Sequence, residues 1–139
     1  MNTQRYRQQH ERILNAIETI NSRLNPEVIM NNTREVRLLI SGLIGKLKFH
    51  LSIEDKVIYP GLLNHENSDI ASTAQKFIDD MGDIIKTVDM YNERWSNEHV
   101  IKADPVVFIQ ETKLILNKLI LRTEKENNEL YKMVDELAY

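Results

Sequence analysis

The chain has 139 residues, which is enough for one domain with a full hydrophobic core. Hydrophobic residues make up 42% and charged residues 28%, as in ordinary globular proteins, and a formal net charge of −3 gives no electrostatic case for binding nucleic acid. The absence of cysteine excludes disulfides, thiolate metal sites and cysteine catalysis, and it fits the cytoplasmic location that we expect.

The chain begins with the polar stretch MNTQRYRQQH, which has no apolar signal-peptide core. No later run approaches the roughly 20 apolar residues that span a bilayer, so we expect no membrane partner. Four glycines and three prolines favour long helices over a sheet of short strands. Polar breaks at 25–32, 60–68 and 96–104 divide the chain into four blocks, each long enough for a helix of roughly five or more turns.

Each block carries an apolar stripe with steps of three and four residues, which is the pattern of a bundle helix. The second block starts with Asn32 followed three residues later by Glu35, and the fourth starts with Asp104 before Pro105. Both pairs are typical of helix starts. Four such helices with short connections predict an all-α protein, an up-down-up-down four-helix bundle that forms a single domain over residues 1–139.

The second and fourth stripes contain polar residues. The second runs through Val36, Ile40, Leu43, Leu47, His50, Glu54 and Val57, and the fourth through Phe108, Thr112, Ile115, Leu119, Arg122, Glu126, Met133 and Leu137, with Leu130 beside it. On the first stripe, His10 also takes a position where Leu or Ile is expected. A buried carboxylate costs several kcal/mol unless a cation pairs with it, and two nearby carboxylates raise each other's pKa. The pattern therefore predicts a cation at this level of the bundle, either a metal ion or the chain's own Arg122.

The two halves of the chain align as a duplicated helical hairpin with an offset of 71 or 72 residues. HERILNAIETINSRL aligns with MGDIIKTVDMYNERW, and KFHLSIEDKVIYP aligns with ILRTEKENNELYK. The matched positions are His10 with Met81, His50 with Arg122, Glu54 with Glu126, and Tyr59 with Tyr131. Both carboxylates recur in the second half, whereas both histidines are replaced there.

These residues resemble a known family, the hemerythrin-like or HHE cation-binding domain. The resemblance covers essentially the whole chain and rests on QQHERIL, HLSIEDKVIYP and the weaker echo RTEKENNELY. It implies a bundle around a non-haem di-iron centre, in which each hairpin supplies histidines to one iron and one carboxylate that bridges both. Family members bind oxygen, sense oxygen, redox state or iron, or handle iron under nitrosative stress, and the resemblance implies a function of this kind.

The resemblance assigns four metal ligands to this chain, His10, His50, Glu54 and Glu126. The histidines of a second iron would fall at Met81 and Arg122. Methionine is a poor ligand for a hard nitrogen-and-oxygen site, and arginine has no lone pair to offer. We therefore expect a reduced site with one or two ions of non-haem iron, with O2 or NO as a further ligand.

The donor set is also compatible with other divalent ions. Two nitrogens and two or more oxygens suit Mn(II) or Zn(II) as well as Fe(II). His50 and Glu54 are four residues apart, so both lie on one helix face within about 5–6 Å and can reach a single ion. We expect Arg122 to stand where the second cation would be and to make a bidentate contact with Glu54 or Glu126.

Two other interpretations stay open at this point. In the first, Arg122 closes a salt-bridge network with the glutamates and histidines, and the metal-free bundle serves as an interaction module. In the second, the protein is an iron-dependent oxidase or peroxidase, which needs an open coordination position, a substrate pocket, and an acid or a base. In every case we expect Tyr59 and Tyr131 to pack in the core.

Overall fold

The computed structural model describes residues 3–137, apart from the side chains at 55, 81, 82 and 137. The described part of the chain is helical throughout and has no strand, which confirms the predicted all-α fold. In chain order its elements are α1 (Gln4–Asn21), α2 (Pro26–Asn31), α3 (Thr33–Ile53), the π-helical segment η1 (Glu54–Ile58), α4 (Tyr59–Leu63), α5 (Ser68–Arg94), α6 (Glu98–Ala103), α7 (Pro105–Lys125), the π-helical segment η2 (Glu126–Tyr131) and α8 (Lys132–Leu137).

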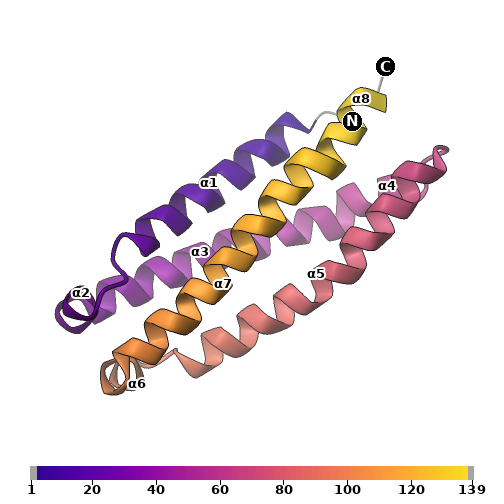
Figure 1. Ribbon diagram of the computed structural model, residues 1–139. Coiled ribbons are helices and arrows are strands. Elements are labelled where there is room, and N and C mark those ends of the chain that lie inside the picture. The colour runs from indigo at the N-terminus through magenta and orange to yellow at the C-terminus, as the bar shows by residue number, and fades with distance from the viewer. Residues whose placement is uncertain (1–2, 138–139) are drawn as a thin grey trace.

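Long helical rods dominate the molecule (Figure 1). They are α1, α3 extended by η1 and α4, α5, and α7 extended by η2 and α8. The chain reverses direction between successive rods, so that α2 and α6 lie at one end of the molecule and α4 and α8 at the other. Successive rods pack against each other, and α1 also packs against α7, which closes the arrangement.

The connections differ in detail from those predicted. The breaks at 25–32 and 96–104 contain the short helices α2 and α6, whereas the helix continues through Pro60 and Gly61 as far as Leu63. Pro60 is the second residue after η1, next to Tyr59, whose N–H bonds to the carbonyl of Glu54, five residues back. Because the backbone already departs from the α-helical pattern there, a residue without an N–H is accommodated.

The two predicted helix starts behave differently. Asp104 caps α7, since its side chain accepts a hydrogen bond from the Val107 N–H at 3.3 Å, and Pro105 takes the first helical position as predicted. Asn32 does precede α3, but within the described chain its side chain makes no capping bond. A single residue separates α2 from α3 there, and the backbone of Asn32 bonds to the carbonyl of Val28 instead.

The buried apolar residues form two groups with polar residues between them. The larger group fills the end of the bundle near α2 and α6 and includes Ile20, Ile29 and Ile101. The smaller group lies near α4 and α8 and consists of Ile58, Tyr59, Leu62, Ile70, Ala74, Phe77, Leu130, Tyr131 and Val134. Along the two rods that contain α3 and α7, the buried residues Glu54, Arg122 and Glu126 lie between the two groups, and His50 lies at the edge of the larger one. A polar layer therefore crosses the core.

The predicted stripe of the second block is wrong at its end. Val57 is 56% exposed, whereas its neighbours Ile58 and Tyr59 are buried. The wide π turn of η1 adds a residue to the helix, which rotates every following side chain relative to the α-helical pattern. In the fourth block Leu130, predicted beside the stripe, is fully buried within η2 for the same reason.

The duplicated hairpin is visible in the elements themselves. The helices α2 and α6 have 6 residues each, and α3 and α7 have 21 residues each. Each 21-residue helix is followed by a π-helical segment that begins at a glutamate, Glu54 in η1 and Glu126 in η2. The repeat thus includes the irregular turns as well as the regular helices. None of the described helices combines the length and the apolar character that crossing a membrane requires.

Candidate metal centre

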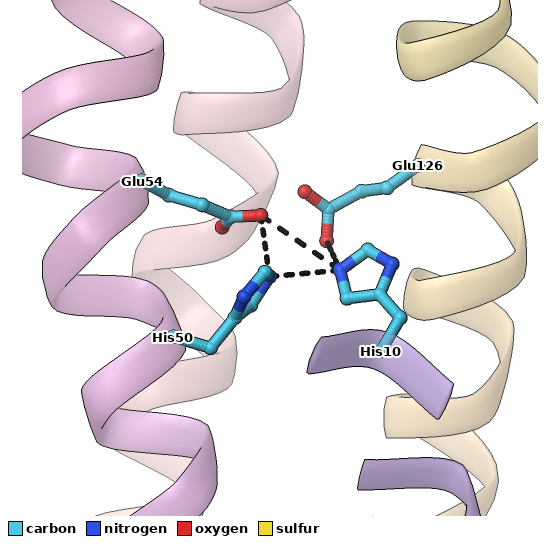
Figure 2. A group of neighbouring side chains, drawn as sticks. All are labelled: His10, His50, Glu54 and Glu126. Carbon is cyan, nitrogen blue, oxygen red and sulfur yellow. Dashed lines mark hydrogen bonds and ion pairs between the residues drawn. The ribbon is translucent and has the colours of Figure 1, made fainter. Parts of the chain in front are cut away.

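The four residues predicted as ligands come together in the polar layer. We call His10, His50, Glu54 and Glu126 the His–Glu cluster; all four are buried. His10 comes from α1, His50 from the last turn of α3, and the glutamates from the first positions of η1 and η2 (Figure 2). One potential ligand atom from each residue lies within 4.8 Å of those of the other three.

The distances within the His–Glu cluster are short. The Nε2 atoms of His10 and His50 lie 2.8 Å apart, and His50 Nε2 lies 2.7 Å from Glu54 Oε1. His10 Nε2 lies 3.6 Å from Glu126 Oε1 and 3.9 Å from Glu54 Oε1. Both imidazoles thus direct the same ring nitrogen toward the two carboxylates, as Figure 2 shows.

The opposite nitrogen of each imidazole is held by a carboxamide. His10 Nδ1 lies 2.8 Å from Asn127 Oδ1, and His50 Nδ1 lies 2.6 Å from Gln9 Oε1. A carboxamide oxygen only accepts hydrogen bonds, so each Nδ1 carries a ring hydrogen. Nε2 is then the nitrogen that can either ligate a metal ion or, in the metal-free protein, share a hydrogen with Glu54. The two carboxamides therefore orient both rings so that each Nε2 faces the carboxylates.

Each carboxylate is held by a tyrosine from the other half of the chain. Tyr131 donates to Glu54 Oε1 at 2.8 Å, and Tyr59 donates to Glu126 Oε2 at 3.1 Å. We predicted only that these tyrosines pack in the core. They do so, and their hydroxyl groups also reach the His–Glu cluster. A signal was present in the sequence, since each tyrosine follows its own half's glutamate by five residues.

Four supporting residues thus surround the His–Glu cluster: Gln9, Tyr59, Asn127 and Tyr131. Each lies on a different helical element from the residue that it holds. Sequence analysis missed the role of Gln9 and Asn127 altogether, although each is the immediate neighbour of a predicted ligand. The supporting contacts therefore run between rods rather than within them.

Burial and mutual repulsion separate the acidities of the two glutamates. Burial raises the pKa of Glu126 well above its ordinary value, and the negative charge of Glu54 raises it further. Burial acts on Glu54 in the same direction, but hydrogen bonds from His10 and His50 hold the pKa of Glu54 well below its usual range. In the metal-free protein Glu126 is therefore the carboxyl group that keeps a proton.

The tyrosine hydroxyl groups remain hydrogen-bond donors. Burial raises the pKa of Tyr59 and of Tyr131, and the nearby charges of Glu54 and Glu126 raise both further. Because both phenols stay protonated, the carboxylate oxygens that they hold act only as acceptors. The tyrosines therefore fix the direction in which each carboxylate faces.

Arg122 is buried beside the His–Glu cluster, with 7% of its surface exposed, but its contacts are not the predicted ones. Its Nε lies 3.8 Å from Glu126 Oε1, while Nη2 donates to the backbone carbonyl of Phe77 and Nη1 lies 3.9 Å from Asp80. The guanidinium also lies 4.4 Å from the centre of the Phe77 ring. The predicted bidentate contact with a glutamate is wrong, because α5 takes most of the guanidinium's interactions.

Three further residues are possible ligands by residue type, Met81, His65 and His99. The side chain of Met81, which matches His10 in the repeat, lies outside the described part of the structure. His65 lies in the connection after α4 and His99 in α6, and both are exposed. Neither belongs to the cluster of potential ligands.

Comparison with protein families gives one match. The model of the hemerythrin HHE cation-binding domain matches residues 1–134, which include both halves of the repeat and the whole His–Glu cluster. Comparison with curated proteins and with solved structures gives no significant match.

Proposed function

Since the chain belongs to the hemerythrin HHE cation-binding family, we propose that it binds one divalent non-haem metal ion, foremost iron, in the His–Glu cluster. The facing Nε2 atoms of His10 and His50 carry this proposal. With a ring hydrogen on each Nδ1, the two Nε2 atoms face each other 2.8 Å apart, which is repulsive unless a metal ion or a proton lies against both. Both histidines are buried, so bulk water does not separate the two nitrogens.

The available donors fit such an ion. Two imidazole nitrogens and two carboxylates suit Fe(II), Mn(II) or Zn(II). Glu54 Oε2 is buried and finds no hydrogen-bond partner among the described residues, so a cation would satisfy an oxygen that the protein leaves unpaired. The carboxamides fit as well, because metal-bound histidines usually donate their second ring N–H to an oxygen acceptor.

A single ion is favoured by the residues at the matching positions of the second half. Arg122 puts a permanent positive charge 3.8 Å from Glu126 Oε1, at the position that matches His50. A second metal ion beside it would meet like-charge repulsion. Glu126 would then face the metal ion on one side and the guanidinium on the other.

We propose oxygen, nitric oxide or redox sensing, or iron handling, as the role of this centre. An iron ion held by two histidines and carboxylates supplies a redox-active centre that can accept a small further ligand. The protein's own residues bury the cluster, orient both imidazoles and keep hydroxyl donors on both carboxylates. The alternative is a metal-free bundle in which Arg122 compensates the charge of the glutamates. The 3.8 Å contact between Arg122 Nε and Glu126 Oε1 favours this alternative.

Metal content per chain tests the proposal. The protein is produced in iron-supplemented medium, purified without a metal-affinity tag, and measured by plasma mass spectrometry beside His50→Ala and the exposed control His65→Ala. We expect about one iron per chain in the wild type and in the control, and a large loss in His50→Ala. A folded wild-type protein that stays metal-free after anaerobic reconstitution would contradict metal binding and support the metal-free alternative.

The number of ions is tested by replacing Arg122. Arg122→His places an imidazole four residues before Glu126, as His50 stands before Glu54, and should raise the metal content above that of the wild type. Arg122→Met removes the charge without adding a ligand and should leave the metal content unchanged. Two ions in the wild type would contradict a single-ion site.

A further inference from the structure

A cavity of about 140 Å³ opens between α1 and α3, directly beside the His–Glu cluster. It is lined by Gln9, Arg12, Ile13, Lys46, Phe49 and His50. The lining therefore includes His50, a predicted ligand, and Gln9, whose carboxamide holds His50. The volume is well below the roughly 300–1,000 Å³ of sites for drug-sized molecules, so an occupant has to be small.

The polar groups around this cavity offer hydrogen-bond donors. Arg12 and Lys46 are donors only, and neither makes an ion pair within the part of the chain that the structure describes. The oxygen of Gln9 already accepts from His50, which leaves the carboxamide N–H groups of Gln9 for other partners. Phe49, which is 64% exposed, and Ile13 supply apolar surface. This lining attracts negative charge.

We propose that the cavity binds a small carboxylate anion, and that Gln9 couples its binding to metal binding at His50. The coupling rests on the proposed function, whereas the anion site does not. The two cations come from facing rods, so an anion between them interacts with both. The anion neutralises charge that the protein itself leaves unpaired at this place.

The direction of the coupling follows from the hydrogen-bond chain. An anion that accepts from the Gln9 N–H polarises the carboxamide and makes its oxygen a stronger acceptor. The bond to His50 Nδ1–H then strengthens, which increases the electron density at Nε2 and favours a bound cation. The anion's own charge acts in the same direction. Anion and metal therefore strengthen each other's binding, and linkage requires the same factor in both directions.

Formate is the probe, and nitrogen–proton NMR is the measurement. Formate is titrated at constant ionic strength into the metal-free protein and into the protein loaded with diamagnetic Zn(II). We expect saturable shifts at Gln9 and Arg12 in both, with an affinity about fivefold higher in the loaded form. Absence of saturable shifts at the cavity in both forms would overturn the site.

Variants locate the site and separate its two parts. Arg12→Gln with Lys46→Gln should weaken formate binding about tenfold or more, since both charge-assisted bonds are lost. The matched control, Arg34→Gln with Lys113→Gln, removes the same charges from exposed positions and should bind formate as the wild type does. Unchanged binding in the first double variant would overturn the assignment to this cavity.

Gln9→Leu tests the coupling itself. It should reduce the difference between the formate affinities with and without Zn(II) to the part that the anion's charge causes, whereas formate that ligates the metal directly would keep the full difference. Persistence of the full difference in Gln9→Leu would therefore overturn the role of Gln9. If the protein takes up no metal, the proposed function and the coupling both fail, while the titration of the metal-free protein still decides the anion site.

Discussion

Tyr131 and Tyr59 each bond a carboxylate of the opposite half, so the two glutamates of the His–Glu cluster are oriented by residues far from them in sequence. Buried carboxylates that lose a hydrogen-bond donor are destabilised, and ligands that lose an orienting partner bind metal less well. Removing one of these hydroxyl groups should therefore have two effects that can be measured separately, one on the free energy of unfolding and one on metal affinity.

Replacing Tyr131 with phenylalanine should lower metal affinity about 10- to 100-fold and cost about 1–3 kcal/mol of stability. The reason is the loss of the donor to Glu54 Oε1. Tyr91→Phe is the matched control, because the Tyr91 hydroxyl is also buried but bonds Thr112 in the larger apolar group. Competition with a metallochromic chelator and urea unfolding give the two quantities. Equal metal affinity in both variants would contradict a role for Tyr131 at the site.

Glu126→Gln should stabilise the metal-free protein more at pH 8 than at pH 5. Burial and the charge of Glu54 raise the pKa of Glu126 in the folded state. Such a group contributes stability that is present below the unfolded pKa and is lost as pH rises through the folded pKa. Glutamine stays neutral at every pH, so the variant does not lose stability as the pH rises. Urea unfolding after chelation measures the effect, and an equal change at both pH values would contradict the assignment of the proton to Glu126.

The exposed Glu124→Gln provides the control for this comparison. Glu124 lies on the same rod but points to solvent, so the same loss of a carboxyl group should leave the free energy of unfolding nearly unchanged at both pH values. A pH-dependent change in Glu124→Gln would mean that the effect comes from net charge rather than from burial.

The sequence predicted the cluster residues but not their supports. His50 and Glu54 interrupt an apolar stripe, and that interruption can be seen without a structure. Gln9 and Asn127 each directly neighbour a residue of the His–Glu cluster in the sequence and would ordinarily face away from it. Their side chains reach histidines on other rods, which depends on how the rods are rotated and spaced. Such contacts between rods leave no periodic signal in one sequence.

At the scale of elements, the two π-helical segments set the register of the site. Glu54 and Glu126 are the first residues of η1 and η2, while Tyr59 directly follows η1 and Tyr131 is the last residue of η2. One added residue in the turn rotates each tyrosine toward the opposite rod, which an uninterrupted α-helix would not do. Stripe analysis assumes a constant period, and for this reason it put Val57 in the core.

Deleting Val57 should therefore abolish metal binding while the protein keeps its helical content. Without the added residue the turn can close to an α-helix, and Tyr59 rotates away from Glu126. Val57→Ala keeps the register, shortens a side chain that is 56% exposed, and should change stability by less than about 0.5 kcal/mol. Circular dichroism and metal content measure the two effects. A helical deletion variant with unchanged metal content would show that the wide turn is dispensable.

At the scale of the whole molecule, the polar layer divides the core into a larger and a smaller apolar group. The His–Glu cluster and Arg122 are buried in the polar layer between the larger group and the smaller one, which lies near α4 and α8. A ligand that binds only the folded state stabilises it, by about 2.7 kcal/mol at 100 times its dissociation constant. Metal bound in the layer should hold the smaller group in place.

Removing the metal should therefore loosen one end of the molecule. After chelation, we expect faster hydrogen exchange at the amides of Ile70, Ala74 and Leu130, which belong to the smaller group. The amides of Ile20 and Ile101, at the other end, should exchange at nearly unchanged rates. Exchange followed by mass spectrometry in metal-loaded and chelated protein gives the comparison. A uniform change along the chain would contradict a division of the core by the polar layer.

The crossed tyrosine–glutamate bonds have a consequence for how the two halves differ. Tyr59 with Glu126 and Tyr131 with Glu54 form a frame that is nearly symmetric between the hairpins. The positive side of the layer has no such symmetry, since His50 in one half stands where Arg122 stands in the other. The two tyrosine–glutamate pairs fix the positions of the carboxylates, but they do not determine which cation neutralises them. One fold can therefore change its cation by a single substitution while the carboxylates stay in place.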